Sequence, residues 1–212
     1  PCRYYPGTPS PHKSPEKLNV IVYRENTEDI YLGIEWKQGD KTGEKLIKLL
    51  NEELIPGTPE HGKKQIPTDA GIGIKPISKT GSQRLVRRAI KQALGLPKDK
   101  QQVTLVHKGN IMKYTEGAFR DWGYELATAE FRDECVTERE SWILSNKEDK
   151  SDISNEDNAR MVDPGYDSLT PEKQKEIVGE VETVLKSIWE THGNGKWKDK
   201  IMVNDRIADS IF

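Results

Sequence analysis

The chain has 212 residues, of which 32% are charged and 33% hydrophobic, and its formal net charge is -2. This length allows one large domain or two small ones. The small net charge argues against a general affinity for nucleic acid or membrane surfaces, and no apolar run approaches the roughly 20 residues that a membrane span needs. The two cysteines, Cys2 and Cys135, form no disulfide framework and no zinc spacing, which favours a reducing, cytoplasmic location.

The first third of the chain predicts turns, strands and one short helix. Residues 1–15 are rich in Pro and should form turns. The apolar, β-branched run 18–23 predicts a buried strand, and the alternating pattern of 29–36 predicts a second strand with Tyr31 facing away from its apolar side. Residues 45–54 predict an amphipathic helix. A third strand is expected at 70–77.

The middle of the chain predicts a helix followed by a strand, a turn and another helix. Residues 82–94 have helical periodicity and a basic face, which we interpret as solvated surface. Residues 103–107 predict a buried strand that ends at a turn containing Lys108 and Asn110. A helix follows, carrying Phe119, Trp122 and Leu126 on one face. This geometry places polar side chains at the carboxyl end of a strand, where α/β proteins build their sites.

The last third changes in character. Residues 132–160 are polar and acidic, which predicts an irregular or mobile surface insertion. Thr170 is the expected N-cap of a long helix that ends at Gly193. A short strand at 201–203 should precede Asp205, the expected cap of a final helix that contains Asp209. A chain that begins with Pro and ends inside an expected helix predicts a piece of a longer protein.

Five polar residues stand at predicted strand ends or helix starts: Arg24, Tyr31, Lys108, Asn110 and Asp209. Arginine and lysine together suit a substrate with several carboxylates, and a crowded cationic site makes lysine and tyrosine usable for proton transfer. An aspartate nearby would attract Mg²⁺ or Mn²⁺. Spacing alone leaves open whether the five converge, and it indicates an α/β chain with a candidate site for an anionic substrate.

Several long motifs resemble those of one family. The segments RENTEDIYLGIEW at 24–36 and HKGNIMKYTEGAF at 107–119 are similar to two signatures of prokaryotic NADP-dependent isocitrate dehydrogenases, within the isocitrate/isopropylmalate dehydrogenase family. RYYPGTPSP at 3–11, GIGIKPIS at 71–78 and RIADSIF at 206–212 match the same enzymes in the same order. The resemblance covers most of residues 1–131 and 201–212. It implies an α/β fold of the isocitrate/isopropylmalate dehydrogenase type, with a small α/β domain, a β-rich clasp and an inserted helical arm.

The resemblance also implies roles for the five residues. Arg24 matches an arginine that binds a substrate carboxylate, and Asn110 lies at the substrate and nicotinamide end of the pocket. Tyr31 matches the tyrosine that protonates the enolate left by decarboxylation. Lys108 matches the lysine that handles the proton of the substrate hydroxyl. Asp209 matches a ligand of the Mg²⁺ or Mn²⁺ site.

The implied reaction is the oxidation of isocitrate by NADP⁺ and the loss of CO₂ to give 2-oxoglutarate. The implied partner is a second copy of the chain, in a homodimer whose active sites are shared, with no nucleic acid and no membrane. The small α/β domain would comprise 1–28, 79–135 and 201–212, the clasp 29–78 and the helical insertion 136–200. Most of the cofactor site would lie outside this chain, so we expect the isolated chain to be inactive.

Two alternatives remain open at this point. A sister enzyme of the isopropylmalate type shares the shorter motif pattern, and a non-catalytic dimerisation module would use the same fold without chemistry. The residues that separate NADP from NAD also lie outside the chain.

Overall fold

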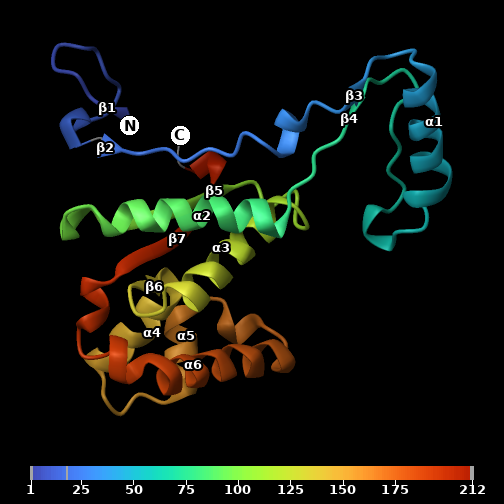
Figure 1. Cartoon of the computed structure of the whole chain (residues 1–212). Coiled ribbons are helices and arrows are strands. Elements are labelled where there is room, and N and C mark those ends of the chain that lie inside the picture. Colours follow the sequence, from blue (N-terminus) through green and yellow to red (C-terminus); the bar gives the residue numbers. More distant parts are fainter. Residues whose placement is uncertain (1, 18, 211–212) are drawn as a thin grey trace. The chain divides into compact units, whose positions relative to one another are not determined.

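The computed structural model describes residues 2–17 and 19–210, and the chain divides into two compact units (Figure 1). Arg24–Gly81 forms one unit, and Pro1–Tyr23 together with Ser82–Phe212 forms the other. No helix in the described part of the chain is both long enough and apolar enough to cross a membrane.

The larger unit is built on a parallel three-stranded sheet with the strand order β5–β7–β6. Strand β5 is Gln102–His107, β6 is Cys135–Thr137 and the central strand β7 is Ile201–Ile207. Val103 of β5 pairs with Val203 of β7, and this register continues to His107 opposite Ile207. The expected strand at 103–107 is therefore confirmed. The strand expected at 201–203 is longer than its pattern indicated.

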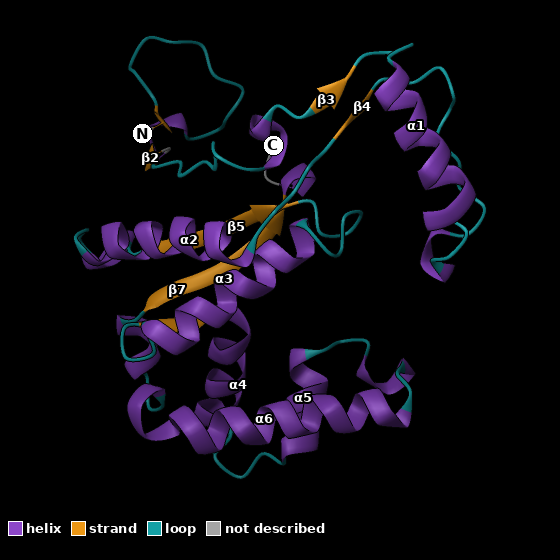
Figure 2. Ribbon diagram, turned by 45° about the vertical axis from the view of Figure 1, so that its right-hand side comes forward, coloured by secondary structure: helices purple, strands orange, loops and turns teal. Residues whose placement is uncertain are grey.

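Helices cover both faces of this sheet, and alternate residues of the strands enter two separate cores. On one face, α2 (Lys79–Leu94) and α3 (Glu116–Glu130) pack with Cys135, Ile201 and Val203. On the other face, Val136 and Met202 pack against α4 (Glu138–Asp149), α5 (Asn155–Val162) and α6 (Pro171–His192). Figure 2 shows α2 and α3 beside β5 and β7. This is the two-sided packing of an α/β protein.

The helical core on the second face contradicts one prediction. Residues 132–160, expected to be irregular or mobile, contain β6, α4 and α5, and Ile143 and Leu144 are 0% exposed. Thr137 caps α4 in a capping box with Glu140, which fixes where the helix begins. The prediction was wrong because these short helices carry few apolar residues each and become stable only by packing on α6.

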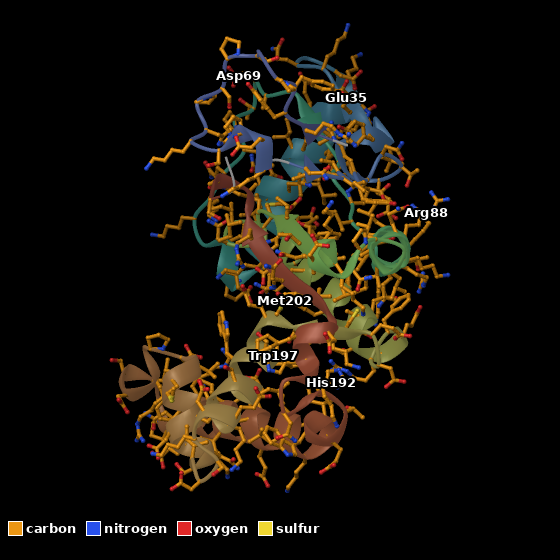
Figure 3. The ribbon with its side chains drawn as sticks, turned by 90° about the vertical axis from the view of Figure 1, so that its left-hand side faces the viewer. Glu35, Asp69, Arg88, His192, Trp197 and Met202 are labelled. Atoms are coloured by element: carbon orange, nitrogen blue, oxygen red, sulfur yellow. The ribbon has the colours of Figure 1, made fainter. Side chains whose placement is uncertain are left out.

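Other expected helices are confirmed in this unit. The α2 helix covers the predicted 82–94 segment, and Arg88 projects outward from it as expected of a solvated face (Figure 3). Thr170 caps α6, and Gly193 follows its last residue. Short 3-10 turns occur at Pro15–Lys17, Lys98–Lys100, Tyr166–Ser168 and Lys196–Asp199. Figure 3 also shows His192, Trp197 and Met202 near the junction of β7 with the helices.

The strand predicted at 18–23 is only partly formed. Strand β2 is Asn19–Val20 and pairs antiparallel with β1, Cys2–Arg3; Leu18 lies outside the described residues. The run is also not buried, since Val22 is 63% exposed. An apolar pattern indicates burial only where a second layer covers it. Val20 and Ile21 are likewise 46% and 43% exposed, so the pairing of β2 with the two-residue strand β1 does not bury the run.

In the Arg24–Gly81 unit the two predicted strands are reduced to one short pair. Asp29–Leu32 forms a 3-10 turn that ends at Gly33 with φ 67°, so Tyr31 stands on a turn and not on a strand face. Strand β3 (Glu35–Trp36) pairs antiparallel with β4 (Ile72–Gly73). The prediction of strands over 29–36 and 70–77 was therefore wrong in extent. In 29–36 the extended backbone begins only after Gly33, whose left-handed conformation ends the 3-10 turn.

The helix of this unit begins earlier than its pattern indicated. Helix α1 is Lys41–Leu49, and its last part widens into a π turn at Leu50–Leu54. Asp40 starts the helix by accepting the N–H groups of Thr42 and Gly43. Gly43 is packed against Trp36, where a Cβ would lie 3.0 Å from the tryptophan Cβ. A further 3-10 turn spans Pro59–His61.

Candidate active site

The carboxyl ends of β5 and β7 carry the best-formed group of candidate residues. Lys108 follows directly on β5, and Asp209 lies in the 3-10 turn Ala208–Ser210 that follows β7. Because the two strands are adjacent and parallel, their ends meet at one edge of the sheet (Figure 2). Lys108 Nζ donates a hydrogen bond to Asp209 Oδ2 across this edge. The structure thus brings together two of the five predicted residues that are 101 positions apart.

Asp209 stands on a 3-10 turn because β7 continues to Ile207. The predicted final helix with Asp205 as its cap was wrong, since Asp205 lies within β7 opposite Leu105. The residues 211–212 of that expected helix lie outside the described part of the chain. The error arose because Asp is favoured at helix starts, whereas here the carboxylate is used inside the strand.

The backbone around Lys108 is fixed by side chains from three elements. Glu116 of α3 accepts the N–H of Lys108 at 2.9 Å, and His107 Nδ1 accepts the N–H of Gly109 at 3.0 Å. His107 Nε2 lies 2.9 Å from Asp205 Oδ2, and the hydroxyl of Tyr124 donates to Asp205 Oδ1 at 2.6 Å. Sequence reasoning missed these four partners. The contact of His107 with Asp205 depends on the register of β5 on β7, and the contacts of Glu116 and Tyr124 depend on the position of α3 beside these strands.

The charge state of Asp205 is set by its surroundings. Burial disfavours its carboxylate, but hydrogen bonds from Tyr124 and His107 outweigh this effect and hold the pKa of Asp205 below its ordinary value. Burial and the neighbouring Asp205 raise the pKa of Tyr124. At neutral pH the structure therefore favours an ionised Asp205 that accepts from a neutral Tyr124.

Asn110 lies on the same turn as Lys108 and is exposed. The chain continues through Ile111 and Tyr114, which are 68% and 74% exposed. Large apolar side chains beside a polar site are typical of a surface that another group covers.

Arg24 and Tyr31 lie in the Arg24–Gly81 unit. The guanidinium of Arg24 is 5.0 Å from the centre of the Tyr31 ring, a cation–π distance. Between them Glu25 accepts the backbone N–H groups of Asn26 and Thr27. Burial opposes ionisation of Glu25, but hydrogen bonds from the hydroxyl of Thr27 and from these N–H groups outweigh it and lower the pKa of Glu25. The segment is thus locally ordered, with both predicted side chains exposed.

The expected metal site is only partly represented. Within residues 2–17 and 19–210, no three His, Cys, Asp or Glu side chains gather as metal ligands. Asp209 offers the oxygen chemistry that Mg²⁺ and Mn²⁺ prefer, but an octahedral shell needs about six oxygens. The described residues therefore do not form this site on their own.

A parallel sheet with a lysine and an aspartate meeting at its carboxyl edge defines an α/β protein with a candidate site at its strand ends. The family model for isocitrate/isopropylmalate dehydrogenases matches residues 1–140, and the chain belongs to this family.

The chain is also similar to several curated relatives. Over all 212 residues it is 82% identical to an isocitrate dehydrogenase [NADP] of a Nostoc species and 76% identical to that of a Synechocystis species, and it covers 45% of each. It is 54% identical over 142 residues to the isocitrate dehydrogenase [NADP] of Archaeoglobus fulgidus, which is 67% of this chain and 32% of that protein. The chain thus spans less than half the length of the relatives that it matches.

Proposed function

We propose that the full-length protein that contains this chain is an NADP-dependent isocitrate dehydrogenase. It would convert isocitrate and NADP⁺ into 2-oxoglutarate, CO₂ and NADPH. The observation that carries the proposal is the 82% identity, over the whole chain, to an isocitrate dehydrogenase [NADP]. The contact between Lys108 and Asp209 supports it, because it gathers two residues of the matching motifs at one strand edge.

Each candidate residue has one role in this proposed reaction. Arg24 binds a carboxylate of the substrate, for which its planar fork of donors is suited, and Asn110 holds the substrate near the nicotinamide. Lys108 takes the proton of the C2 hydroxyl as the hydride leaves C2. Tyr31 returns a proton to C3 after CO₂ is lost. When bound, NADP⁺ supplies the hydride acceptor.

A metal ion and a second subunit complete the proposal. Asp209 would be one oxygen ligand of Mg²⁺ or Mn²⁺. The exposed Ile111 and Tyr114 beside Lys108 support a homodimer in which a second subunit covers this edge. In that arrangement Lys108 and Asp209 of one subunit would serve the pocket that holds Arg24 and Tyr31 of the other. Residues 136–200 would then be an addition to the small domain with no catalytic group.

The test is the turnover of the full-length protein with isocitrate and with 3-isopropylmalate, each with NADP⁺ and with NAD⁺. Turnover of isocitrate with NADP⁺ supports the proposal, and turnover of isopropylmalate alone would refute it. Lys108→Met and Tyr31→Phe should each lower kcat by about 10²- to 10⁴-fold, the usual effect of losing a proton-transfer group.

Mixing these two variants tests the shared site. If Lys108 serves the partner's pocket, random reassociation gives heterodimers with one intact site, and about a quarter of the wild-type activity should return. If both residues act within one subunit, every site keeps a defect and no activity returns. The single variants at twice the concentration are the matched controls.

A further inference from the structure

Three side chains form a connected set beneath the turn that carries Lys108. His107 is buried, with 3% of its surface exposed, and its two ring nitrogens have different partners. The N–H of Gly109 points at Nδ1 from 3.0 Å, and Asp205 lies 2.9 Å from Nε2. Tyr124 donates to the second oxygen of Asp205 at 2.6 Å. These contacts link α3, β5 and β7 within one compact unit.

The partners determine which nitrogen of His107 carries the proton. A backbone N–H can only donate, so Nδ1 must present its lone pair to Gly109. The single proton of the neutral ring then sits on Nε2 and is donated to Asp205. Asp205 must therefore accept from both His107 and Tyr124, as an ionised carboxylate does. In this assignment each of the three hydrogen bonds joins one donor to one acceptor.

This set acts directly on the peptide that follows Lys108. Gly109 also packs against α3, where an added Cβ would lie 2.9 Å from Gly117 Cα. On the other side of the residue, Glu116 accepts the N–H of Lys108 itself. The direction in which the lysine leaves the backbone is thus fixed by His107 on one side and by Glu116 on the other.

We propose that His107, held in one tautomer by Asp205 and Tyr124, is a positioning residue that fixes Lys108 for its proton transfer. The inference rests on the proposed function for its catalytic meaning. Its structural content, a bare Nδ1 bonded to the amide of Gly109, stands independently of that function. A shift of about 1 Å in a reacting group can lower a rate by about 10²-fold, so the position of Lys108 matters.

A matched pair of substitutions separates the two ring nitrogens. In His107→Asn the side-chain oxygen occupies the place of Nδ1 and can still accept from Gly109, but it does not reach Asp205. In His107→Gln the amide nitrogen occupies the place of Nε2 and can still donate to Asp205, while the acceptor for Gly109 is lost. In the full-length enzyme, His107→Gln should lower kcat by about 10- to 100-fold with little change in the KM for isocitrate. His107→Asn should retain most of kcat.

His192→Asn provides the control. His192 is also a buried, neutral histidine, and its Nε2 donates to the carbonyl oxygen of Cys135 at 3.0 Å, among the helices. Its substitution should lower stability without changing kcat per folded molecule. A loss of kcat in His192→Asn equal to that in His107→Gln would overturn the proposal, and so would equal losses in the two His107 variants.

Nuclear magnetic resonance of the full-length protein, with isotope-labelled histidine and glycine, gives a readout that needs no turnover. The imidazole nitrogens of His107 should report a protonated Nε2 and a bare Nδ1, and the amide of Gly109 should exchange slowly in wild type and His107→Asn but fast in His107→Gln. A protonated Nδ1 in the wild type would overturn the proposal even if both variants fail to fold. If the full-length protein shows these signals but does not turn over isocitrate, the proposed function is refuted and the positioning contacts stand.

Discussion

Glu140 ties β6 to the start of α4, and its replacement by glutamine should destabilise the larger unit. One carboxylate oxygen accepts from Arg132 Nη1 at 2.7 Å, and the other accepts from Arg132 Nη2 at 2.9 Å and from the N–H of Thr137 at 2.8 Å. The side chains of Arg132 and Glu140 are 27% and 13% exposed. In Glu140→Gln the amide oxygen can replace only one of these oxygens. The amide N–H₂ group then faces a guanidinium N–H, donor against donor.

The size of the effect follows from these contacts. One charge-assisted hydrogen bond is lost, and a half-buried guanidinium loses its ionised partner, which together cost about 2–3 kcal/mol. For a urea m-value of about 2–3 kcal/mol/M, the midpoint should fall by about 1 M. Tryptophan fluorescence measures the urea midpoint of this unit, because four of the five tryptophans lie in the same unit as Glu140.

The pH dependence gives a sharper test. Burial of Glu140 opposes ionisation, but hydrogen bonds from Arg132 and Thr137 outweigh it and lower its pKa below the ordinary 4.5. The stabilisation is therefore fully present above about pH 4.5 and is lost as the pH falls through the lowered pKa of the folded state. The difference between wild type and Glu140→Gln should shrink over that range. A difference that stays constant from pH 7 to pH 3 would refute the reasoning, as would an equal loss in the surface control Glu182→Gln.

Three further predictions concern other positions. Ile143→Ala, at a side chain that is 0% exposed in the helical core, should lower the free energy of unfolding by about 2–5 kcal/mol; the neighbouring Trp142→Ala, with 47% of its surface exposed, should cost clearly less in the same urea titration. Burial of His192 lowers its pKa below the ordinary 6.5, so as the pH falls this histidine is protonated in the unfolded chain before it is protonated in the folded chain. The melting temperature of the wild type should therefore fall between pH 7.5 and pH 5.5, and that of His192→Asn should fall less. Gly109→Ala should destabilise by about 1–3 kcal/mol, because the added Cβ would meet His107 Nδ1 and the backbone of Gly117, and the backbone amide of residue 109 should lose its slow exchange. An unchanged unfolding midpoint in Gly109→Ala would contradict the close approach of the turn to α3.

The sequence was sufficient for elements that depend on local pattern. The strand, turn and helix around Lys108 follow from a β-branched run, a glycine and helical periodicity, and the cap at Thr170 follows from its own neighbours. The residues that determine these elements lie within a few positions of one another in the sequence. The placement of Lys108 at a strand end was therefore predictable. Its contact with Asp209 was not, because it depends on β7 lying beside β5 and continuing to Ile207, beyond the predicted strand.

Elements that depend on distant partners were not predictable in this way. The apolar run ending at Tyr23 has the pattern of a buried strand, but burial requires a covering layer that the pattern does not contain. Asp205 has the residue type of a helix cap, and its use as an acceptor for His107 depends on a register between strands 98 positions apart. The helices α4 and α5 were missed because each carries few apolar residues and both depend on packing against α6.

The strand order β5–β7–β6 has a consequence for the way in which this protein folds. Closing a flexible loop of the 101 positions between Lys108 and Asp209 would cost about 4 kcal/mol of chain entropy. We expect the helices α4, α5 and α6, which lie within that loop, to form first and so to shorten the loop that remains to be closed. Contacts this distant in sequence form slowly, and we expect the edge that carries Lys108 to be completed after the helical core. Substitutions such as Ile143→Ala should therefore slow formation of the contact between Lys108 and Asp209. Ile143 has this effect from the core on the opposite face of the sheet from α2 and α3.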